Sequence, residues 1–125
     1  MSQLEEIKDQ IAALGYQLIM ISPDQPDKIK ETIDSHHFSH LFLSDSKVAA
    51  AIAFGIAFQV DSETLEIFAE YGIDLNAASG ESHNILPVPA VFILQSDGTI
   101  SFEYVNPDFT SRLNRNVLLA AAKAV

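Results

Sequence analysis

The spacing of hydrophobic residues predicts a chain of alternating helices and strands. Between residues 2 and 14 apolar side chains recur every 3 or 4 positions, which is typical of a helix with one buried face, and Gly15 ends the pattern. Ser2 and Glu5 form a capping box at the start of this helix. Its predicted inward positions are Leu4, Ile7, Ile11 and Leu14. Residues 17–22 are nearly all apolar, which favours a strand covered on both faces inside a sheet.

The alternation continues through the middle of the chain. A helix is predicted from Pro26 to residues 36–38, because proline suits a first turn and nearby acidic residues complement the helix dipole. A short buried strand at 41–43 comes before an alanine-rich helix at 47–54, and the polar residues 44–46 can cap that helix.

The next stretch combines an apolar link, a helix and a long loop. After the link at 56–60, Asp61 can cap a helix that ends at Gly72. Residues 73–86 are rich in Gly, Ser and Asn, and we predict that they form the longest and most mobile loop. A final helix is predicted around 113–125. Its inward positions are Leu113, Val117, Leu118 and Ala121.

The strongest local prediction is a β-hairpin. Residues 88–94 are rich in β-branched and aromatic side chains, and residues 100–105 alternate apolar with polar ones. Gly98, preceded by aspartate, supplies the positive φ that the turn between them needs. Pro87 and Pro89 lie where the first strand begins, a position at which a missing N–H does least harm.

The order of these elements predicts an α/β fold. Two strand–helix units followed by an antiparallel hairpin and a closing helix imply a mixed sheet of about four strands with helices on both faces. The chain has 125 residues and contains no repeat or linker, so we expect a single domain, 1–125.

Composition excludes several classes of function. Cysteine is absent from the 125 residues, so disulfides, thiolate nucleophiles and thiolate metal sites are excluded within this sequence. A net charge of −10 disfavours nucleic acid and membranes as partners. No apolar run approaches the ~20 residues that span a bilayer. Because the first residues do not resemble a secretion signal, we expect a soluble cytoplasmic protein, and we expect no cofactor.

Histidines form the first candidate site. His36 and His40 are four residues apart, the spacing with which two imidazoles can share a metal, and His37 and Asp34 lie nearby. No further ligand is fixed by the spacing, so we prefer histidines that complement the dipole at a helix C-terminus. His83, in the predicted loop, has no visible partner.

Polar side chains at the ends of two predicted strands form the second candidate site, because open α/β sheets bind ligands there. These residues are Ser22, Asp24, Ser44 and Asp45. Helix capping is the preferred interpretation, since no nucleophile elbow accompanies the serines. The carboxylate pairs that could serve acid–base chemistry are Asp24 with Asp27 and Glu63 with Glu66, but solvated helix starts explain them. The residues interpreted as core aromatics are Phe38, Phe42, Phe54, Phe58, Phe68, Phe92 and Phe102.

Several short motifs occur in the order found in a known family. Residues 21–24 and 43–45 end two strands, and Val88-Pro89 opens the hairpin. Further similar stretches are 23–28, 53–55 and 105–108. From about Leu4 to the C-terminus the chain resembles the peroxiredoxin-like branch of the thioredoxin-fold proteins, the alkyl hydroperoxide reductase and thiol-specific antioxidant family.

The resemblance implies a truncated thioredoxin-like fold in which Val88 and Pro89 mark the family site. It also implies that the Val88–Pro89 bond is cis. Family members carry their reactive cysteine after a strand that precedes the first helix of this sequence, so the chain resembles a member without that strand and that cysteine. We therefore expect a domain without thiol redox activity, not an enzyme by itself, that serves as a binding or assembly module or is a truncated member.

Two other interpretations stay open. The chain could be the C-terminal part of a thiol peroxidase or oxidoreductase whose cysteine segment is encoded upstream, or it could be a histidine-based metal protein. The missing strand also leads to a structural expectation. Each buried, unpaired backbone group costs about 1 to 3 kcal/mol, so the gap should close. Closure would pair 18–21 antiparallel with 91–94 and give the strand order 41–43, 18–21, 91–94, 100–104. Otherwise a homodimer would form across the gap.

Overall fold

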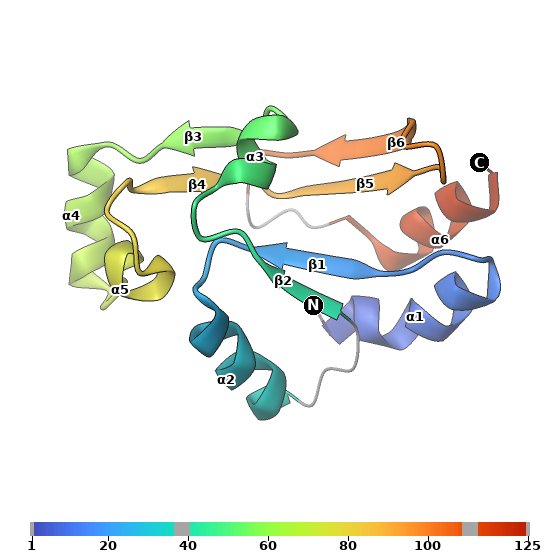
Figure 1. Ribbon diagram of the computed structural model, residues 1–125, viewed down its shortest axis with the longest axis horizontal. Helices are drawn as coiled ribbons and strands as arrows, with labels where there is room; N and C mark the ends of the chain where they lie inside the picture. The colour runs from blue at the N-terminus through green and yellow to red at the C-terminus, as the bar shows by residue number, and fades with distance from the viewer. Residues whose placement is uncertain (1, 37–40, 109–112, 125) are drawn as a thin grey trace. The chain divides into compact units, whose positions relative to one another are not determined.

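The computed structural model describes residues 2–36, 41–108 and 113–124 (Figure 1). Its helices are α1 (Ser2–Ala13), α2 (Pro26–His36), α3 (Ala49–Ala53), α4 (Ser62–Glu70), α5 (Leu75–Ser79) and α6 (Arg115–Ala124). Its strands are β1 (Ile19–Ser22), β2 (Leu41–Ser44), β3 (Ala57–Gln59), β4 (Ile85–Pro87), β5 (Ala90–Leu94) and β6 (Ile100–Val105). The predicted α/β class is confirmed. Within the described ranges, no helix has the length and apolar character needed to cross a membrane.

The described strands are hydrogen-bonded in pairs. β1 is bonded to β2, β3 to β4, and β5 to β6. The predicted closed order is therefore wrong in its central pair: β1 is bonded to β2 and β5 to β6, as predicted, but no bond between β1 and β5 joins the two pairs. The pairs that form join strands closer in the sequence, for which loop closure costs less entropy. The alternative, a homodimer, stays a prediction. β3 and β4 pair antiparallel from Ala57↔Pro87 to Gln59↔Ile85, and the sequence predicts neither strand.

The described residues group into two compact units. Unit 1 contains the residues up to Ile19, Leu41 and the residues from Val88 onward, so it holds α1, β5, β6 and α6. Unit 2 contains residues 20–36 and Phe42–Pro87, so it holds α2 to α5, β3, β4 and most of β1 and β2. Both units are built from separated stretches of chain, and the assignment of one domain stays a prediction.

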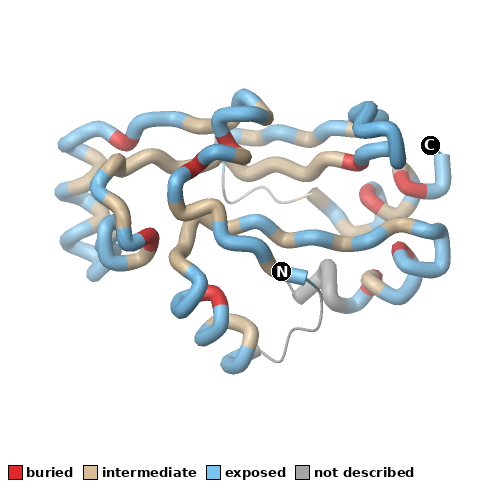
Figure 2. Tube along the Cα trace, in the orientation of Figure 1, coloured by how far each residue is buried: buried red, intermediate tan, exposed pale blue. Residues whose placement is uncertain are grey.

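Two helices and the hairpin share the core of unit 1. Ile7 and Ile11 of α1, Ile93 of β5, and Leu118 and Ala122 of α6 are buried and pack together (Figure 2). The spacing of four residues on each helix places these side chains on one helix face. Unit 1 is therefore held by contacts between its two ends in the sequence.

Three residues predicted to be buried are exposed. Leu14 lies beyond the last residue of α1, and Val117 is 50% exposed although its neighbour Leu118 is only 5% exposed. Phe58, on the short strand β3, is also exposed. These predictions are wrong because α1 ends earlier than expected and because α6 turns a different face inward. Leu4 and Phe38 lie outside the described side chains.

β1 and β2 are also more exposed than the sequence predicts. In unit 2 the side chains of Ile21 and Leu43 are 48% and 45% exposed, and we call these two the β1–β2 aliphatic residues. In unit 1 the side chains of Ile19 and Leu41 are 43% and 44% exposed. The sequence predicts that strands this apolar are covered on both faces.

A carboxylate holds the start of α3. Asp45 accepts hydrogen bonds at Oδ1 from the backbone N–H of Ala50 and at Oδ2 from that of Ala51, both at 3.0 Å. Val48, the residue before the helix, has φ 55°, a left-handed conformation that is rare for a β-branched residue. Its side chain is almost fully buried. The predicted capping of this helix is confirmed for Asp45.

The hairpin turn follows its predicted chemistry. Gly98 has φ 90°, and its N–H donates to the backbone carbonyl of Gln95 at 2.9 Å. Asp97 Oδ1 accepts from the N–H of Thr99 at 2.9 Å. The hydrogen bonds from the backbone and side chain of Thr99 lower the pKa of Asp97. The register shifts between Ile93 and Leu94, which marks a β-bulge beside the turn.

The prediction of one long loop at 73–86 is wrong. α5 lies inside this range, with Asp74 Oδ1 accepting from the N–H groups of Asn76 and Ala77 at 3.0 and 3.2 Å. Gly80 ends the helix with φ 74°. Asp74 and Gly80, six positions apart, are therefore the sequence signals that mark the two ends of α5. The helix between them has only five residues, too few to show a helical spacing of apolar side chains.

We expect Leu118→Ala to lower the free energy of unfolding by about 2 to 5 kcal/mol, because it opens a cavity in the unit 1 core. Urea unfolding followed by circular dichroism measures this loss. The matched control is Val117→Ala, one residue away and half exposed, which should cost less than about 1 kcal/mol. Equal losses for the two variants would contradict the assigned core.

We expect Asp45→Ala to lower the free energy of unfolding by about 1 to 2 kcal/mol, because two N–H groups of α3 lose their acceptor. Asp45→Asn keeps one acceptor oxygen and should lose less. The same urea titration compares the two variants. A neutral Asp45→Ala would show that α3 starts without help from this carboxylate.

Candidate functional site

The polar residues at the ends of β1 and β2 come together within unit 2. Ser44 Oγ donates to the backbone carbonyl of Asp24 at 2.6 Å, and the N–H of Asp24 donates to Ser22 Oγ at 3.2 Å. The N–H of Asp45 donates to the carbonyl of Ser22 at 2.7 Å. Both hydroxyls are thus bonded to backbone groups of Asp24 and fix the turns after the two strands. Helix capping, the interpretation preferred from the sequence, is seen for Asp45.

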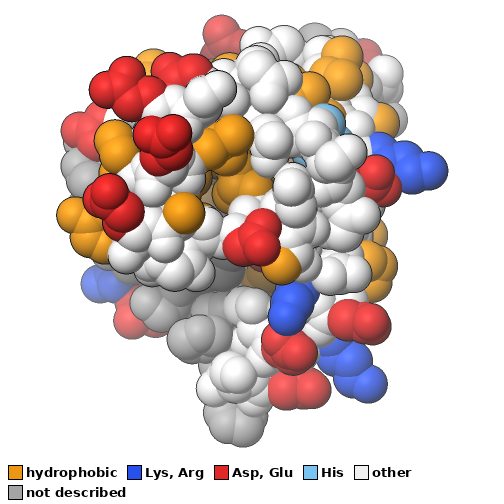
Figure 3. All heavy atoms as spheres, turned by 90° about the vertical axis from the view of Figure 1, so that its left-hand side faces the viewer, with side chains coloured by type: hydrophobic (Ala, Val, Ile, Leu, Met, Phe, Trp, Pro, Cys, Tyr) orange, Lys and Arg blue, Asp and Glu red, His pale blue; other side chains and the backbone are white. Residues whose placement is uncertain are grey.

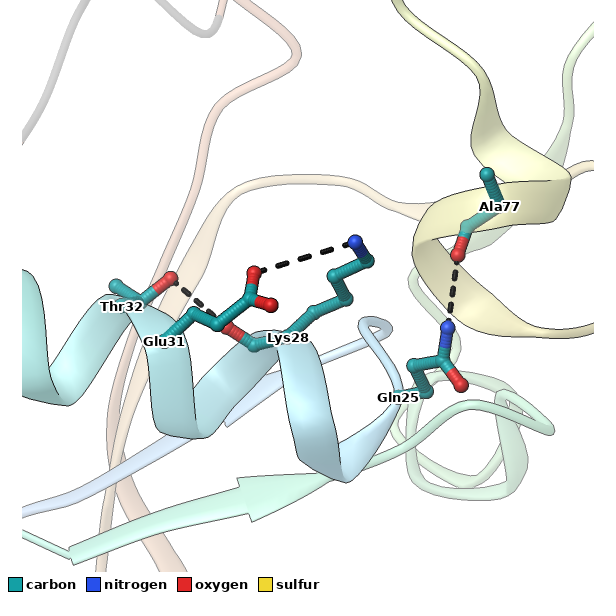
Figure 4. A network of polar contacts seen from close by, with 5 residues as sticks. All are labelled: Gln25, Lys28, Glu31, Thr32 and Ala77. Atoms are coloured by element: carbon teal, nitrogen blue, oxygen red, sulfur yellow. Dashed lines mark hydrogen bonds and ion pairs between the residues drawn. The ribbon is translucent and has the colours of Figure 1, made fainter.

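Gln25 joins the turn after β1 to α5 (Figure 4). Its Nε2 donates to the carbonyl of Ala77 at 2.9 Å, and its backbone N–H donates to the carbonyl of Ala78 at 2.8 Å. A Cβ built on Gly80 would lie 3.3 Å from Gln25 Oε1, so the turn and the end of α5 approach closely. The ion pair drawn in the same view lies within α2 and is exposed.

His83 has partners on both ring nitrogens, so the prediction that it has none is wrong. Nε2 lies 2.7 Å from the carbonyl of Ser46, and Nδ1 lies 2.9 Å from the N–H of Ile85. A carbonyl only accepts and an N–H only donates, so the proton is on Nε2 and Nδ1 is the acceptor. Gln59 Nε2 donates to the carbonyl of His83 at 2.9 Å. His83 therefore connects three segments of unit 2.

A small cavity lies beside these residues. Pro23 and Asp24 line it together with Leu75 and Ser79 of the α5 segment and with His83. Its volume is about 20 Å³, which is about the room that one water molecule needs. A cavity of this size is too small for an organic substrate.

The histidine and carboxylate hypotheses have different outcomes. His37 and His40, and the side chain of His36, lie outside the described residues. Over the parts of the chain that are described, no three His, Cys, Asp or Glu side chains are grouped so that they could hold a metal. The predicted acid–base pairs lie on helix starts, with Asp27, Glu63 and Glu66 exposed and Asp24 half-buried. Asp61 is the N-cap of α4. The hydrogen bonds from the side chain and the backbone of Thr64 lower the pKa of Asp61.

Val88 and Pro89 follow β4 and come before β5, and both are half-buried. No peptide bond between described residues is cis, so the Val88–Pro89 bond is trans and the cis prediction is wrong. The trans form is the lower-energy form of an X–Pro bond by about 0.5 to 1 kcal/mol. The carbonyl of Pro89 accepts from the N–H of Asn106 at 3.1 Å, which extends the hairpin contacts. That these two residues mark a family site stays a prediction.

Comparison with known proteins identifies the family. A search of curated proteins finds no match. The family model described as the AhpC/TSA family matches residues 1–103, which is most of the 125-residue chain. The helices and short strands described above are compatible with a thioredoxin-like fold, as the resemblance of the sequence implies. On the extent of this match, the chain belongs to the AhpC/TSA family.

Proposed function

We propose that this chain is an AhpC/TSA-family domain that has no thiol redox activity of its own and acts as a binding or assembly module. The observation that carries the proposal is the absence of cysteine from a member of this family. Thiol chemistry requires a thiolate nucleophile. His83 and the strand-end serines, which are the other candidates, are bonded to backbone groups. We also propose the cytoplasm as its location.

The β1–β2 aliphatic residues support the assembly part of the proposal. A two-stranded sheet is marginally stable in water by itself, and exposed aliphatic groups on neighbouring strands are typical of interaction surfaces. We propose that a second copy of the chain covers these residues in a homodimer. Salt at physiological ionic strength screens the repulsion between two acidic chains beyond about 8 Å, so close apolar contact can outweigh it.

We expect the purified chain to consume hydrogen peroxide no faster than buffer, with a dithiol reductant present and metals chelated, because it offers no thiolate. Peroxide is measured over time with a colorimetric probe, and the heat-unfolded chain is the control. A rate above buffer that disappears on unfolding would contradict the proposed lack of activity.

We expect light scattering to give a mass of twice 13.7 kDa at micromolar concentration. Ile21→Glu should yield the single-chain mass, because it places a carboxylate among the β1–β2 aliphatic residues. Ile52→Glu makes the same change on α3, where the side chain is 60% exposed, and should remain dimeric. A single-chain mass for the unchanged protein would refute self-assembly and leave a different protein as the partner.

A further inference from the structure

The exposed face of α4 carries apolar and acidic residues side by side. Glu63, Glu66, Ile67, Glu70 and Tyr71 follow one another at intervals of 3, 1, 3 and 1 residues, and we call these five residues the α4 face. Positions 3 and 4 apart lie on the same side of a helix. Ile67 is 47% exposed and Tyr71 is 78% exposed. Two large side chains with apolar surface therefore stand in solvent between three carboxylates.

The α4 face is presented by a helix that is fixed at both ends. Asp61 Oδ1 accepts from the N–H of Thr64 at 2.7 Å at the first turn. At the last turn, the N–H groups of Tyr71 and Ile73 donate to the carbonyl of Phe68 at 3.0 and 2.9 Å. Phe68 itself is half-buried. The backbone that carries the five residues is thus fixed at both ends of α4, which favours binding because less backbone order has to be gained.

No cation in the neighbouring sequence balances these carboxylates. Between Lys47 and Arg112 the sequence contains neither lysine nor arginine. The acidic residues from the N-cap of α4 to the second residue after α5 are Asp61, Glu63, Glu66, Glu70, Asp74 and Glu81. Figure 3 shows acidic side chains among hydrophobic ones over the side of unit 2 that carries α4 and α5. Like charges at these helical spacings are mutually unfavourable, and a cationic partner would relieve them.

We infer that the α4 face binds a cationic amphipathic helix of another protein, with apolar side chains over Ile67 and Tyr71 and lysine or arginine beside the three glutamates. This inference rests on the proposed role as a binding module and names the chemistry of the partner. Nucleic acid and anionic lipid carry the wrong charge. A second copy would bring a chain of net charge −10, and two α4 faces would repel one another.

The test uses a fluorescent peptide of about 18 residues, or five helical turns, in which leucines form one face and lysines the other. Its fluorescence anisotropy is titrated with the full chain at an ionic strength of about 0.15 M. We expect saturable binding that weakens about tenfold when Glu63, Glu66 and Glu70 are all changed to Gln, since exposed pairs contribute modestly and add up. Ile67→Ser combined with Tyr71→Ser should weaken binding to a similar extent.

Two matched controls separate the α4 face from general attraction. Changing Asp9 and Asp34 to Asn and Glu103 to Gln removes the same charge from exposed positions elsewhere and should leave the affinity within about twofold. A peptide of the same composition in scrambled order, without an apolar face, should bind at least about tenfold more weakly. Tyr71 lies directly after the last residue of α4. Tyr71→Ser alone therefore tests the α4 face even if Ile67→Ser combined with Tyr71→Ser disturbs the helix.

Three results with the peptides would overturn the inference. They are no binding of the amphipathic peptide, equal weakening by the two triple variants, and equal binding of the scrambled peptide. None of these results bears on thiol chemistry, which the peroxide assay decides independently. A lower mass in light scattering for the α4 triple variant alone would instead show that a second copy occupies the face, and would also overturn it.

Discussion

Each strand in the described sheets has a single hydrogen-bonded neighbour, so β-sheet formation by itself leaves most of the stability to other contacts. In unit 1 the helices at the two ends of the sequence supply this stability. Ile7 and Ile11 meet Leu118 and Ala122 across the hairpin residue Ile93. The hairpin is local in sequence, whereas its apolar cover comes from far away along the chain. Unit 1 therefore depends on both ends of the chain being in place.

Unit 2 relies more on polar side chains bound to backbone groups. Asp45 holds the start of α3, Gln25 joins the turn after β1 to α5, and His83 reaches the segment before α3. Short helices and three-residue strands bury few apolar groups, so hydrogen bonds from side chains to the backbone contribute a larger share of the interactions that fix the conformation of unit 2. In this family member the side chains that first suggest chemistry are used to fix loops.

The parts of the fold that the sequence predicts are those with local causes. The first helix follows from the spacing of its apolar residues, the hairpin turn from Gly98, and the start of α4 from its cap Asp61. β3 and β4 have only three residues each, too few to show a period of two, and they pair only through a distant partner. The partners of His83 are likewise invisible in the sequence, since Ser46 lies 37 positions away. The bond before Pro89 was misjudged because it was inferred from a resemblance and not from its own surroundings.

The long stretch without lysine or arginine has a practical consequence for dissecting the chain. Trypsin cuts only after those two residues, so it has no site between Lys47 and Arg112. One of the boundaries between the two units, at Pro87 and Val88, falls inside that stretch. A protease that cuts after glutamate finds Glu81 six residues before this boundary, just past α5. Trypsin has sites in α1, α2 and α6, whereas the connection at Pro87 and Val88 is open only to proteases of other specificity.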